Sequence, residues 1–318
     1  MLLTLKQLQR NLKMNSKNTD QTNEAKKTKK KNTHLKKRYL GIYEKAINKK
    51  FDWATKIDIA KAGGYDFIEF SVDESPERLE RLTWSNAQIN ELKKLLIEKN
   101  FYFNSMCLSA HRRYPFGSRD PKKRAMALDI MEKAIILAKK LGIRIIQIAA
   151  YDVYYEVPNQ VTRNYFLQGM KKAAALAQKH SVTLAFETMD VDFAGTISKC
   201  LAFLKEIDSP MFYIYPDLGN LNQFTEDVAN EILLGKDKIV AFHFKDTLPR
   251  KFKEVPWGKG TVDFPKSLKE IKRNKLDVPI LIEMWSKNDP EETAEQNIEL
   301  LREAKAFYLK QWKRAKGE

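Results

Sequence analysis

The feature that most constrains this chain is a regular alternation of short apolar segments with longer amphipathic ones, which runs from Tyr39 to the last helical segment. The apolar segments are near-continuous runs, which is typical of parallel strands covered by helices. The predicted strands cover 39–46, 66–73, 102–111, 144–153, 182–190, 211–220, 239–246 and 278–286. The predicted helices cover 52–63, 84–99, 121–141, 159–180, 195–208, 224–235, 263–274 and 291–313.

Eight strand–helix units over residues 39–318 match the count and length of a (β/α)8 barrel. An open doubly wound sheet would also alternate, but no glycine fingerprint follows the first strand. Local signals agree with the predicted helices: Ser85 or Thr83 can cap one, Asp120 precedes a proline at the start of another, and Gly142 can end it. We therefore predict an α/β fold, a (β/α)8 TIM barrel, as one catalytic domain over 39–318.

The net charge of +16 is unevenly distributed along the chain. Residues 1–38 hold 12 Lys and Arg against Asp20 and Glu24, a net of +10, which leaves +6 for the remaining 280 residues. A polybasic tail such as "KKTKKKNTHLKKR" (26–38) cannot bury itself, so we expect residues 1–38 to be mostly disordered. The charge therefore does not predict a specific nucleic-acid partner.

Cysteines and apolar runs indicate the compartment. Cys107 and Cys200 lie far apart and form no CxxC pattern, which argues against a disulfide framework and suits a reducing compartment. No apolar run approaches the length of a membrane helix. We expect a cytoplasmic protein without a membrane partner.

Four consecutive strands each finish with one carboxylate or imidazole. Glu187 ends the fifth predicted strand, Asp217 the sixth, His243 the seventh and Glu283 the eighth. Each residue alone could form a salt bridge at the rim. Together they occupy equivalent positions at the end of the barrel where such folds place their chemistry.

The seventh strand indicates which way these side chains point. Alternation places Ala241, His243 and Lys245 on one face and Phe242 and Phe244 on the other. Three carboxylates gathered at the barrel axis would repel one another unless a cation joined them. Oxygen-rich ligands with a single nitrogen fit Mn²⁺, Co²⁺, Mg²⁺ or Zn²⁺, so we predict one divalent metal ion at Glu187, Asp217, His243 and Glu283.

Further polar residues are candidates for substrate binding. "SAHRRYPFG" (109–117) follows the third strand, and its arginines could bind an anionic substrate, although Arg113 could equally brace a loop. The loop after the seventh strand is basic, and phosphate sites of such barrels often use this loop, which makes Lys251, Lys253 and Lys259 candidates. The residues that we expect to bind substrate are Glu44, Glu69, His111, Arg112, Lys245 and Lys259.

From about Tyr39 to the last helix, the chain resembles the L-ribulose-5-phosphate 3-epimerases of the ascorbate-utilisation type, within the xylose isomerase-like barrel superfamily. The matching stretches are "LGIYEKA" (40–46), "DFIEFSVDES" (66–75), "SMCLSAHRRYPFGS" (105–118), "YDVYYE" (151–156), "YPDLGNL" (215–221), "HFKDT" (243–247), "FKEVPWGKGTVDF" (252–264) and "LIEMWS" (281–286). The run "SMCLSAHRR" is long and idiosyncratic, so chance agreement is improbable. Residues 1–38 have no counterpart in this resemblance.

The resemblance implies an isomerase that inverts C3 of a ketopentulose 5-phosphate, interconverting L-xylulose 5-phosphate and L-ribulose 5-phosphate in L-ascorbate catabolism. It places Glu187, Asp217, His243 and Glu283 on the superfamily's metal-binding positions. Proton removal next to the ketone would give an enediolate, and Glu187 and Glu283 would act as the acid and base on its two faces. The resemblance to this superfamily also implies a homodimer.

Three alternatives exist, and the second of them fails on its number of histidines. An aldose–ketose isomerase on the same barrel would move hydrogen between C1 and C2 instead. An abasic-site endonuclease needs several zinc-bound histidines, whereas this barrel offers only His111, His180 and His243. A non-enzymatic nucleic-acid binder would have to keep its binding after residues 1–38 are deleted.

Overall fold

The computed structural model describes residues 39–317, and the predictions for residues 1–38 lie outside them. Eight parallel strands form one sheet in the order β6-β5-β4-β3-β2-β1-β8-β7. The strands are β1 (Leu40–Tyr43), β2 (Phe67–Val72), β3 (Phe103–Leu108), β4 (Ile145–Ala149), β5 (Thr183–Glu187), β6 (Phe212–Tyr215), β7 (Phe242–Phe244) and β8 (Ile280–Ile282). Each lies inside a segment predicted as a strand.

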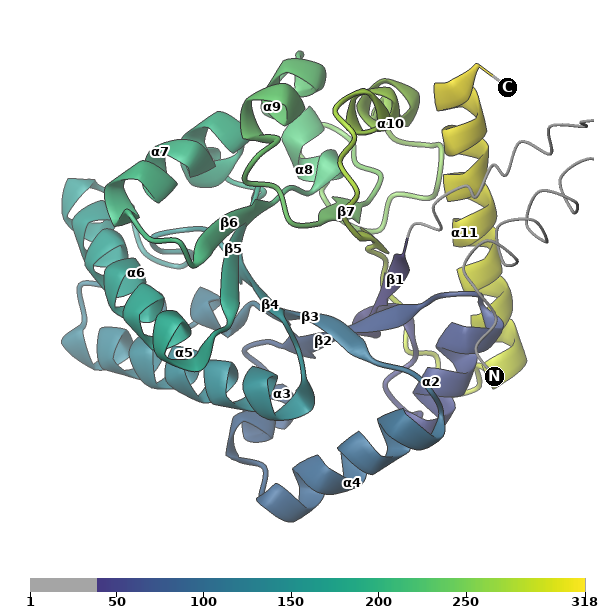
Figure 1. Ribbon diagram of the computed structural model, residues 1–318, viewed down its shortest axis with the longest axis horizontal. Coiled ribbons are helices and arrows are strands. Elements are labelled where there is room, and N and C mark those ends of the chain that lie inside the picture. The colour runs from purple at the N-terminus through teal and green to yellow at the C-terminus, as the bar shows by residue number, and fades with distance from the viewer. Residues whose placement is uncertain (1–38, 318) are drawn as a thin grey trace, which may run out of the picture. The chain divides into compact units, whose positions relative to one another are not determined.

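The ends of this sheet meet and close the barrel. β1 pairs with both β2 and β8, and β7 pairs with β8. Between β6 and β7 the ladder is reduced to the bridges Ile214↔Ile239 and Asp217↔His243. Figure 1 shows the strands around the centre with the helices outside them. The predicted (β/α)8 barrel is confirmed.

Long helices cover the outside of the strands. They are α2 (Trp53–Ala62), α4 (Asn86–Glu98), α5 (Pro121–Leu141), α6 (Gln160–His180), α7 (Ile197–Ile207), α9 (Val228–Gly235), α10 (Phe264–Arg273) and α11 (Ala294–Lys316). Ser85 caps α4 through a capping box, Asp120 caps α5, and Gly142 ends α5 in the left-handed conformation. No helix within residues 39–317 is both long and apolar enough to span a lipid bilayer.

Short helices occupy several loops that follow strands. They are η1 (Glu44–Ala46), α3 (Pro76–Glu80), η2 (Arg81–Thr83), η3 (Ala110–Arg112), η4 (Asp192–Ala194) and α8 (Leu218–Asn222). The predicted sixth strand, 211–220, was too long. Its strand ends at Tyr215, because Pro216 cannot donate to the ladder and Asp217 caps α8 by accepting a hydrogen bond from Asn220.

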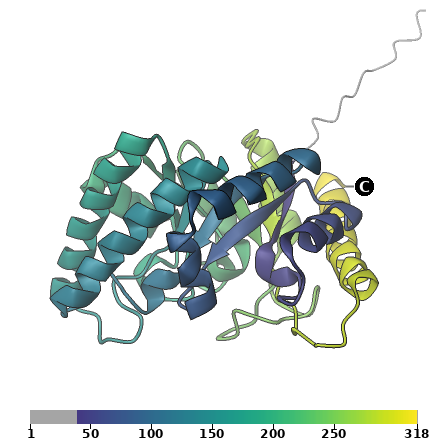
Figure 2. The ribbon, with the colours of Figure 1, turned by 90° about the horizontal axis from the view of Figure 1, so that it is seen from below.

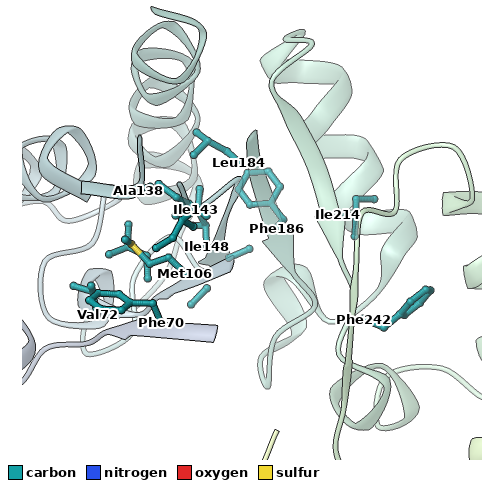
Figure 3. Close-up of a cluster of buried hydrophobic side chains, with 14 of the residues drawn as sticks. Phe70, Val72, Met106, Ala138, Ile143, Ile148, Leu184, Phe186, Ile214 and Phe242 are labelled. Carbon is teal, nitrogen blue, oxygen red and sulfur yellow. The ribbon is translucent and has the colours of Figure 1, made fainter. Parts of the chain in front are cut away.

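The main core lies between the sheet and the helices. Phe242 and Phe244 belong to it, which confirms the predicted outward face of β7. Figure 3 shows part of this cluster, with Phe186 of β5 and Phe242 of β7 among its labelled side chains. Ala241 packs inside the barrel with Ile145, Ala185 and Tyr215, as the alternation predicted.

Loops at one end of the barrel carry the candidate functional segments of the sequence. The loop between β7 and α10 and the loop between β8 and α11 lie at the same, lower edge of the barrel in Figure 2. Both follow the carboxyl ends of their strands, which is where barrel enzymes assemble their sites. Cys107 and Cys200 are both buried as free thiols.

Candidate active site

Four acidic or imidazole side chains converge at the carboxyl ends of β5 to β8. Glu187 is the last residue of β5, Asp217 caps α8 after β6, His243 is the middle residue of β7, and Glu283 follows β8. Each offers one ligand atom, and these atoms lie within 4.8 Å of one another. All four residues are buried. The structure therefore brings together the whole set predicted from strand ends that lie up to 96 positions apart in the sequence.

The imidazole of His243 turns one nitrogen toward the three carboxylates. Its Nδ1 lies 3.1 Å from Glu187 Oε1, 3.5 Å from Glu283 Oε2 and 3.8 Å from Asp217 Oδ2. Since all three acids lie around the same nitrogen, Nδ1 is the atom of His243 available as a ligand.

The other ring nitrogen is held by Glu69. Nε2 lies 3.0 Å from Glu69 Oε2, and the second oxygen of Glu69 accepts a hydrogen bond from the Ser105 hydroxyl at 2.7 Å. A carboxylate that accepts from one imidazole nitrogen fixes the tautomer in which the opposite nitrogen is free to bind a cation.

Two further side chains contact the acids. Lys245 Nζ lies 3.0 Å from Glu283 Oε2 and 3.3 Å from Asp217 Oδ2. The Gln147 amide donates a hydrogen bond to Glu187 Oε2. Gln147 is the lone amide within the apolar strand "RIIQIAA", and this is the sequence signal that could have indicated its role.

The acids differ in their affinity for protons. Burial raises the pKa of Glu187, and repulsion from Glu283 adds to that shift against the opposing charge of His243. Burial likewise raises the pKa of Asp217 well above its usual range, although Lys245 opposes the shift. Burial would also raise the pKa of Glu283, but the charges of Lys245 and His243 outweigh it and hold that pKa well below its usual range.

The cluster could hold a divalent metal ion. Asp217 Oδ2 and Glu283 Oε2 are buried and have no hydrogen-bond partner, and the charge of Lys245, 3.3 Å and 3.0 Å away, is their nearest compensation. Three carboxylates with one imidazole form the oxygen-rich donor set suited to Mg²⁺, Mn²⁺, Co²⁺ or Zn²⁺. The residues present therefore fit such an ion.

A pocket opens above this cluster. Glu187 and Glu283 line it, and so do Arg112 and Lys245, two of the residues predicted to bind substrate. The remaining lining residues are Tyr43, Lys45, Cys107, Ser109, Ala149, Met189, Asp190, Asn220, Phe252, Lys253 and Trp285. Lys253 is the one of the three candidate loop lysines that lines the pocket.

Four other residues predicted to bind substrate do not line this pocket. Glu69 is turned to His243. Glu44 is fully buried and paired with Arg81, which donates hydrogen bonds of 2.7 Å and 2.8 Å to its two carboxylate oxygens. His111 is buried against Phe116 and bonds the Ala127 carbonyl, and Lys259 is exposed.

Comparison with known proteins agrees with this architecture. Residues 57–304 match the family described as the xylose isomerase-like TIM barrel. A probable L-ribulose-5-phosphate 3-epimerase UlaE of Mycoplasma pneumoniae is 57% identical over 281 residues, which cover 88% of this chain and 91% of that protein. The L-ribulose-5-phosphate 3-epimerase UlaE of Escherichia coli (strain K12 / DH10B) is 46% identical, covering 80% of this chain and 90% of that protein.

Solved structures of other sugar epimerases share the fold. A D-allulose 3-epimerase from Methylomonas sp. superimposes with a TM-score of 0.68 at 21% identity, covering 86% of this chain and 98% of that one. An L-ribulose 3-epimerase superimposes with a TM-score of 0.72 at 18% identity, covering 88% of this chain and 96% of that one. At these identities the likeness concerns the fold alone.

The barrel and the acidic cluster at its mouth define an enzyme of the xylose isomerase-like TIM-barrel class. The relatives at 46–57% identity narrow this class, because they match the chain over most of its length. The chain belongs to the L-ribulose-5-phosphate 3-epimerase family and is an isomerase that acts as an epimerase.

Proposed function

We propose that this enzyme inverts C3 of a ketopentulose 5-phosphate and interconverts L-xylulose 5-phosphate and L-ribulose 5-phosphate. The name of the 57% identical relative, a probable L-ribulose-5-phosphate 3-epimerase UlaE, supports the substrate and the role in L-ascorbate catabolism. The observation that carries the proposal is the buried cluster of Glu187, Asp217, His243 and Glu283, with ligand atoms within 4.8 Å of one another.

The cluster supplies the two requirements of epimerisation. A divalent ion bound there would stabilise the negative charge that develops on a ketose when a proton leaves the carbon next to the carbonyl. The residues of the chain must then remove a proton from C3 on one face and return one on the other. Glu187 and Glu283 come from β5 and from the end of β8, and both line the pocket, so they are the proposed proton carriers.

Neighbouring side chains hold these two glutamates in place. Gln147 donates to the Oε2 atom of Glu187, and Lys245 pairs with Glu283. Asp217 is fixed by its role as the cap of α8, and His243 by Glu69. Asp217 and His243 are the proposed fixed ligands, and Lys245, which lines the pocket, is the proposed donor of a hydrogen bond to a substrate hydroxyl.

The test is turnover of L-xylulose 5-phosphate by the full chain, measured with and without a chelator and again after Glu283→Gln. Gln keeps the size of the side chain but can neither carry the proton nor contribute a charge to the ion. We expect at least a hundredfold loss of kcat in each case, with Lys251→Met, an exposed residue outside the pocket, as the matched control.

Turnover in D₂O identifies the carbon that exchanges. Deuterium at C3 of recovered sugar is the expected result. Deuterium at C1 or C2 but never at C3 would contradict the proposal and indicate an aldose–ketose isomerase.

A further inference from the structure

The backbone at Asp217 lies beyond the end of the ladder that joins β5 to β6. The last pair of that ladder is Glu187↔Tyr215. Pro216, the next residue, has no N–H to donate, and its carbonyl accepts a hydrogen bond of 2.9 Å from the backbone N–H of His243 on β7. The N–H of Asp217 therefore needs a partner on the side of β5 that strand pairing does not supply.

The side chain of Thr188 supplies that partner. Its Oγ1 accepts a hydrogen bond of 2.9 Å from the backbone N–H of Asp217 and donates one of 3.2 Å to the carbonyl of the same residue. Thr188 directly follows Glu187, the last residue of β5, so one hydroxyl continues the pairing a residue beyond the ladder. Thr188 and Asp217 are both fully buried, and a buried N–H that loses its acceptor has no water to turn to.

Asn220 of α8 completes the arrangement around Asp217. Its backbone N–H donates to Asp217 Oδ1 at 2.5 Å, and its side-chain Nδ2 donates to the carbonyl of Thr188 at 2.8 Å. The backbone of Asp217 is thus held by Thr188, and one oxygen of its carboxylate is held by α8. The other oxygen, Oδ2, has no hydrogen-bond partner and lies 3.8 Å from His243 Nδ1, so it is the oxygen that faces the cluster.

The backbones of the other three cluster residues are placed by the sheet itself. Glu187 and His243 belong to β5 and β7. The backbone N–H of Glu283 donates to the carbonyl of Phe244 at 3.0 Å, which extends the pairing of β8 with β7. The backbone N–H of Asp217 donates instead to a side chain. Because the ligands of a metal site must be held to within about 0.5 Å, the position of Asp217 is the one that a single hydroxyl group can change.

We propose that Thr188 is a positioning residue, which sets the place of Asp217 Oδ2 among the ligand atoms of the cluster. The inference rests on the proposed function, because it concerns the metal site that this function uses. Valine at position 188 would keep a branched side chain but leave the buried N–H of Asp217 without an acceptor. Asp217 could then regain a partner only by moving, and its ligand oxygen would move with it. Serine would keep the hydroxyl and the position of Asp217.

The test compares Thr188→Val and Thr188→Ser with the wild type, all as full-length protein. Thr162→Val is the matched control, because Thr162 is also fully buried and its hydroxyl also accepts from a backbone N–H, that of Asn159 at 2.8 Å, at the start of α6. The first readout is the dissociation constant of Mn²⁺, titrated into metal-free protein. We expect it to rise roughly 10- to 100-fold in Thr188→Val and to stay within about threefold of the wild type in the other two variants.

Tm and kcat separate positioning from a general loss of stability. Both Val variants lose a buried hydrogen bond, so both should fall in Tm. Of the two, Thr188→Val should also lose at least about tenfold in kcat at saturating Mn²⁺, because a small misplacement of a site residue slows the chemical step. Thr188→Ala removes the hydroxyl without adding a second methyl group, and it carries the same predictions should the Val variant not fold.

The outcomes distinguish this inference from the proposed function. Wild-type affinity for Mn²⁺ in Thr188→Val, or an equal loss of affinity in Thr162→Val, would overturn the inference and leave the proposed function intact. A wild type that binds no Mn²⁺ would overturn the inference as well, because there would be no ligand site to position. A wild type whose affinity for Mn²⁺ depends on Thr188, but which does not interconvert the two sugar phosphates, would overturn the proposed function and leave the role of Thr188 standing.

Discussion

At the residue scale, Glu69 is a buried carboxylate that contacts one of the proposed metal ligands. Its carboxylate is fully buried between the Nε2 atom of His243 and the hydroxyl of Ser105, and it does not reach the pocket. The sequence predicts that Glu69 binds the substrate; in the structure its carboxylate contacts His243, and we expect it to act as a positioning residue for that imidazole. The strand pattern predicts that Glu69 points into the barrel. It does not predict that Glu69 contacts His243, because these residues lie 174 positions apart in the sequence, on β2 and β7.

Loss of Glu69 should weaken metal binding. Glu69→Ala removes the acceptor that fixes the His243 tautomer, and we expect a 10- to 100-fold lower affinity for Mn²⁺, because losses of this size follow removal of partners that orient a ligand. Glu69→Gln keeps an acceptor oxygen and should recover part of the loss. The measurement is titration of metal-free protein with Mn²⁺, followed by electron paramagnetic resonance of the free ion. A purely structural role would lower Tm in both variants and leave the Mn²⁺ affinity unchanged.

His111 should make the barrel sensitive to mild acid. Burial lowers the pKa of His111 to about 4, although the hydrogen bond with the Ala127 carbonyl opposes the shift. Below pH 6.5 the unfolded chain therefore binds a proton at His111 that the folded chain excludes until about pH 4, so stability falls as pH decreases through this window. From pH 7.5 to 5.0 the loss amounts to about 2 kcal/mol.

Urea unfolding at pH 7.5 and pH 5.0 measures this loss when the wild type is compared with His111→Gln. Contributions of other titrating groups are common to both proteins, and the Gln amide can still donate to Ala127. We expect the pH-dependent change in unfolding free energy to be smaller in the variant by about 2 kcal/mol. Equal changes in the two proteins would mean that His111 does not titrate as described.

At the element scale, successive side chains from His243 to Asp246 lie on opposite sides of β7 and its continuation, and they have different roles. His243 and Lys245 face the acids, while Phe244 packs in the outer core. Asp246 follows the strand and accepts hydrogen bonds from the backbone N–H groups of Gly258 and Gly260, at 2.9 Å and 3.0 Å. It therefore fastens the loop that carries Lys253 over the barrel mouth.

A side chain at position 260 should release this loop. A Cβ built on Gly260 would lie 1.9 Å from Asp246 Oδ1 and 2.4 Å from the Thr247 carbonyl, so Gly260→Ala cannot keep both hydrogen bonds. We expect trypsin to cleave at Lys251, Lys253 or Lys259 at least tenfold faster than in the wild type, because cleavage requires local opening. The control is Thr261→Ala, which alters the side chain beside this anchor without adding a Cβ.

The trypsin result separates the loop from the barrel. Tm should change little in Gly260→Ala, since most residues of the loop are exposed. An unchanged cleavage rate would show that the loop does not depend on the Asp246 anchor.

The strands were predictable from sequence, whereas the contacts behind them were not. Apolar runs fixed the positions of all eight strands, and strand ends in a parallel barrel meet at one mouth, which is why the residues of the cluster could be grouped in advance. The partner of Glu44 could not be found in the same way. Arg81 lies in η2, a short helix after α3 that carries no periodic signal, and its pairing holds the pKa of the buried Glu44 at about 2.

The three loop lysines illustrate the same limit. Nothing in the sequence distinguishes three lysines of this loop, Lys251, Lys253 and Lys259. Of the three, Lys253 lines the pocket. The choice among them is made by the anchor of the loop at Asp246 and by packing against Trp285, and both are tertiary contacts. The sequence therefore predicts that a basic loop lies near the site, but it does not predict which lysine of the loop lines the pocket.

At the scale of the whole molecule, closure of the barrel is what assembles the cluster. β6 and β7 meet through only two bridges, and one of them joins Asp217 to His243. Two of the proposed ligands thus sit at the point of closure. The predicted homodimer stays a prediction, and a sedimentation mass equal to that of one chain would contradict it.

The uneven charge of the chain predicts that its two parts can be separated experimentally. Residues 1–38 carry a net charge of +10, whereas the residues described for the cluster and the pocket belong to 39–317. A chain that begins at Tyr39 should keep the Tm and the kcat/KM of the full chain within error.

Binding of a mixed DNA duplex, in contrast, should be weakened by the deletion, because it depends on counterion release from phosphates by lysines and arginines. We expect the full chain to bind weakly with a steep salt dependence and the shortened chain to lose at least tenfold in affinity at low salt. Duplex binding that survives the deletion undiminished would place the cationic surface on the barrel and revive a nucleic-acid role for it, and a large fall in kcat/KM would instead give residues 1–38 a part in catalysis.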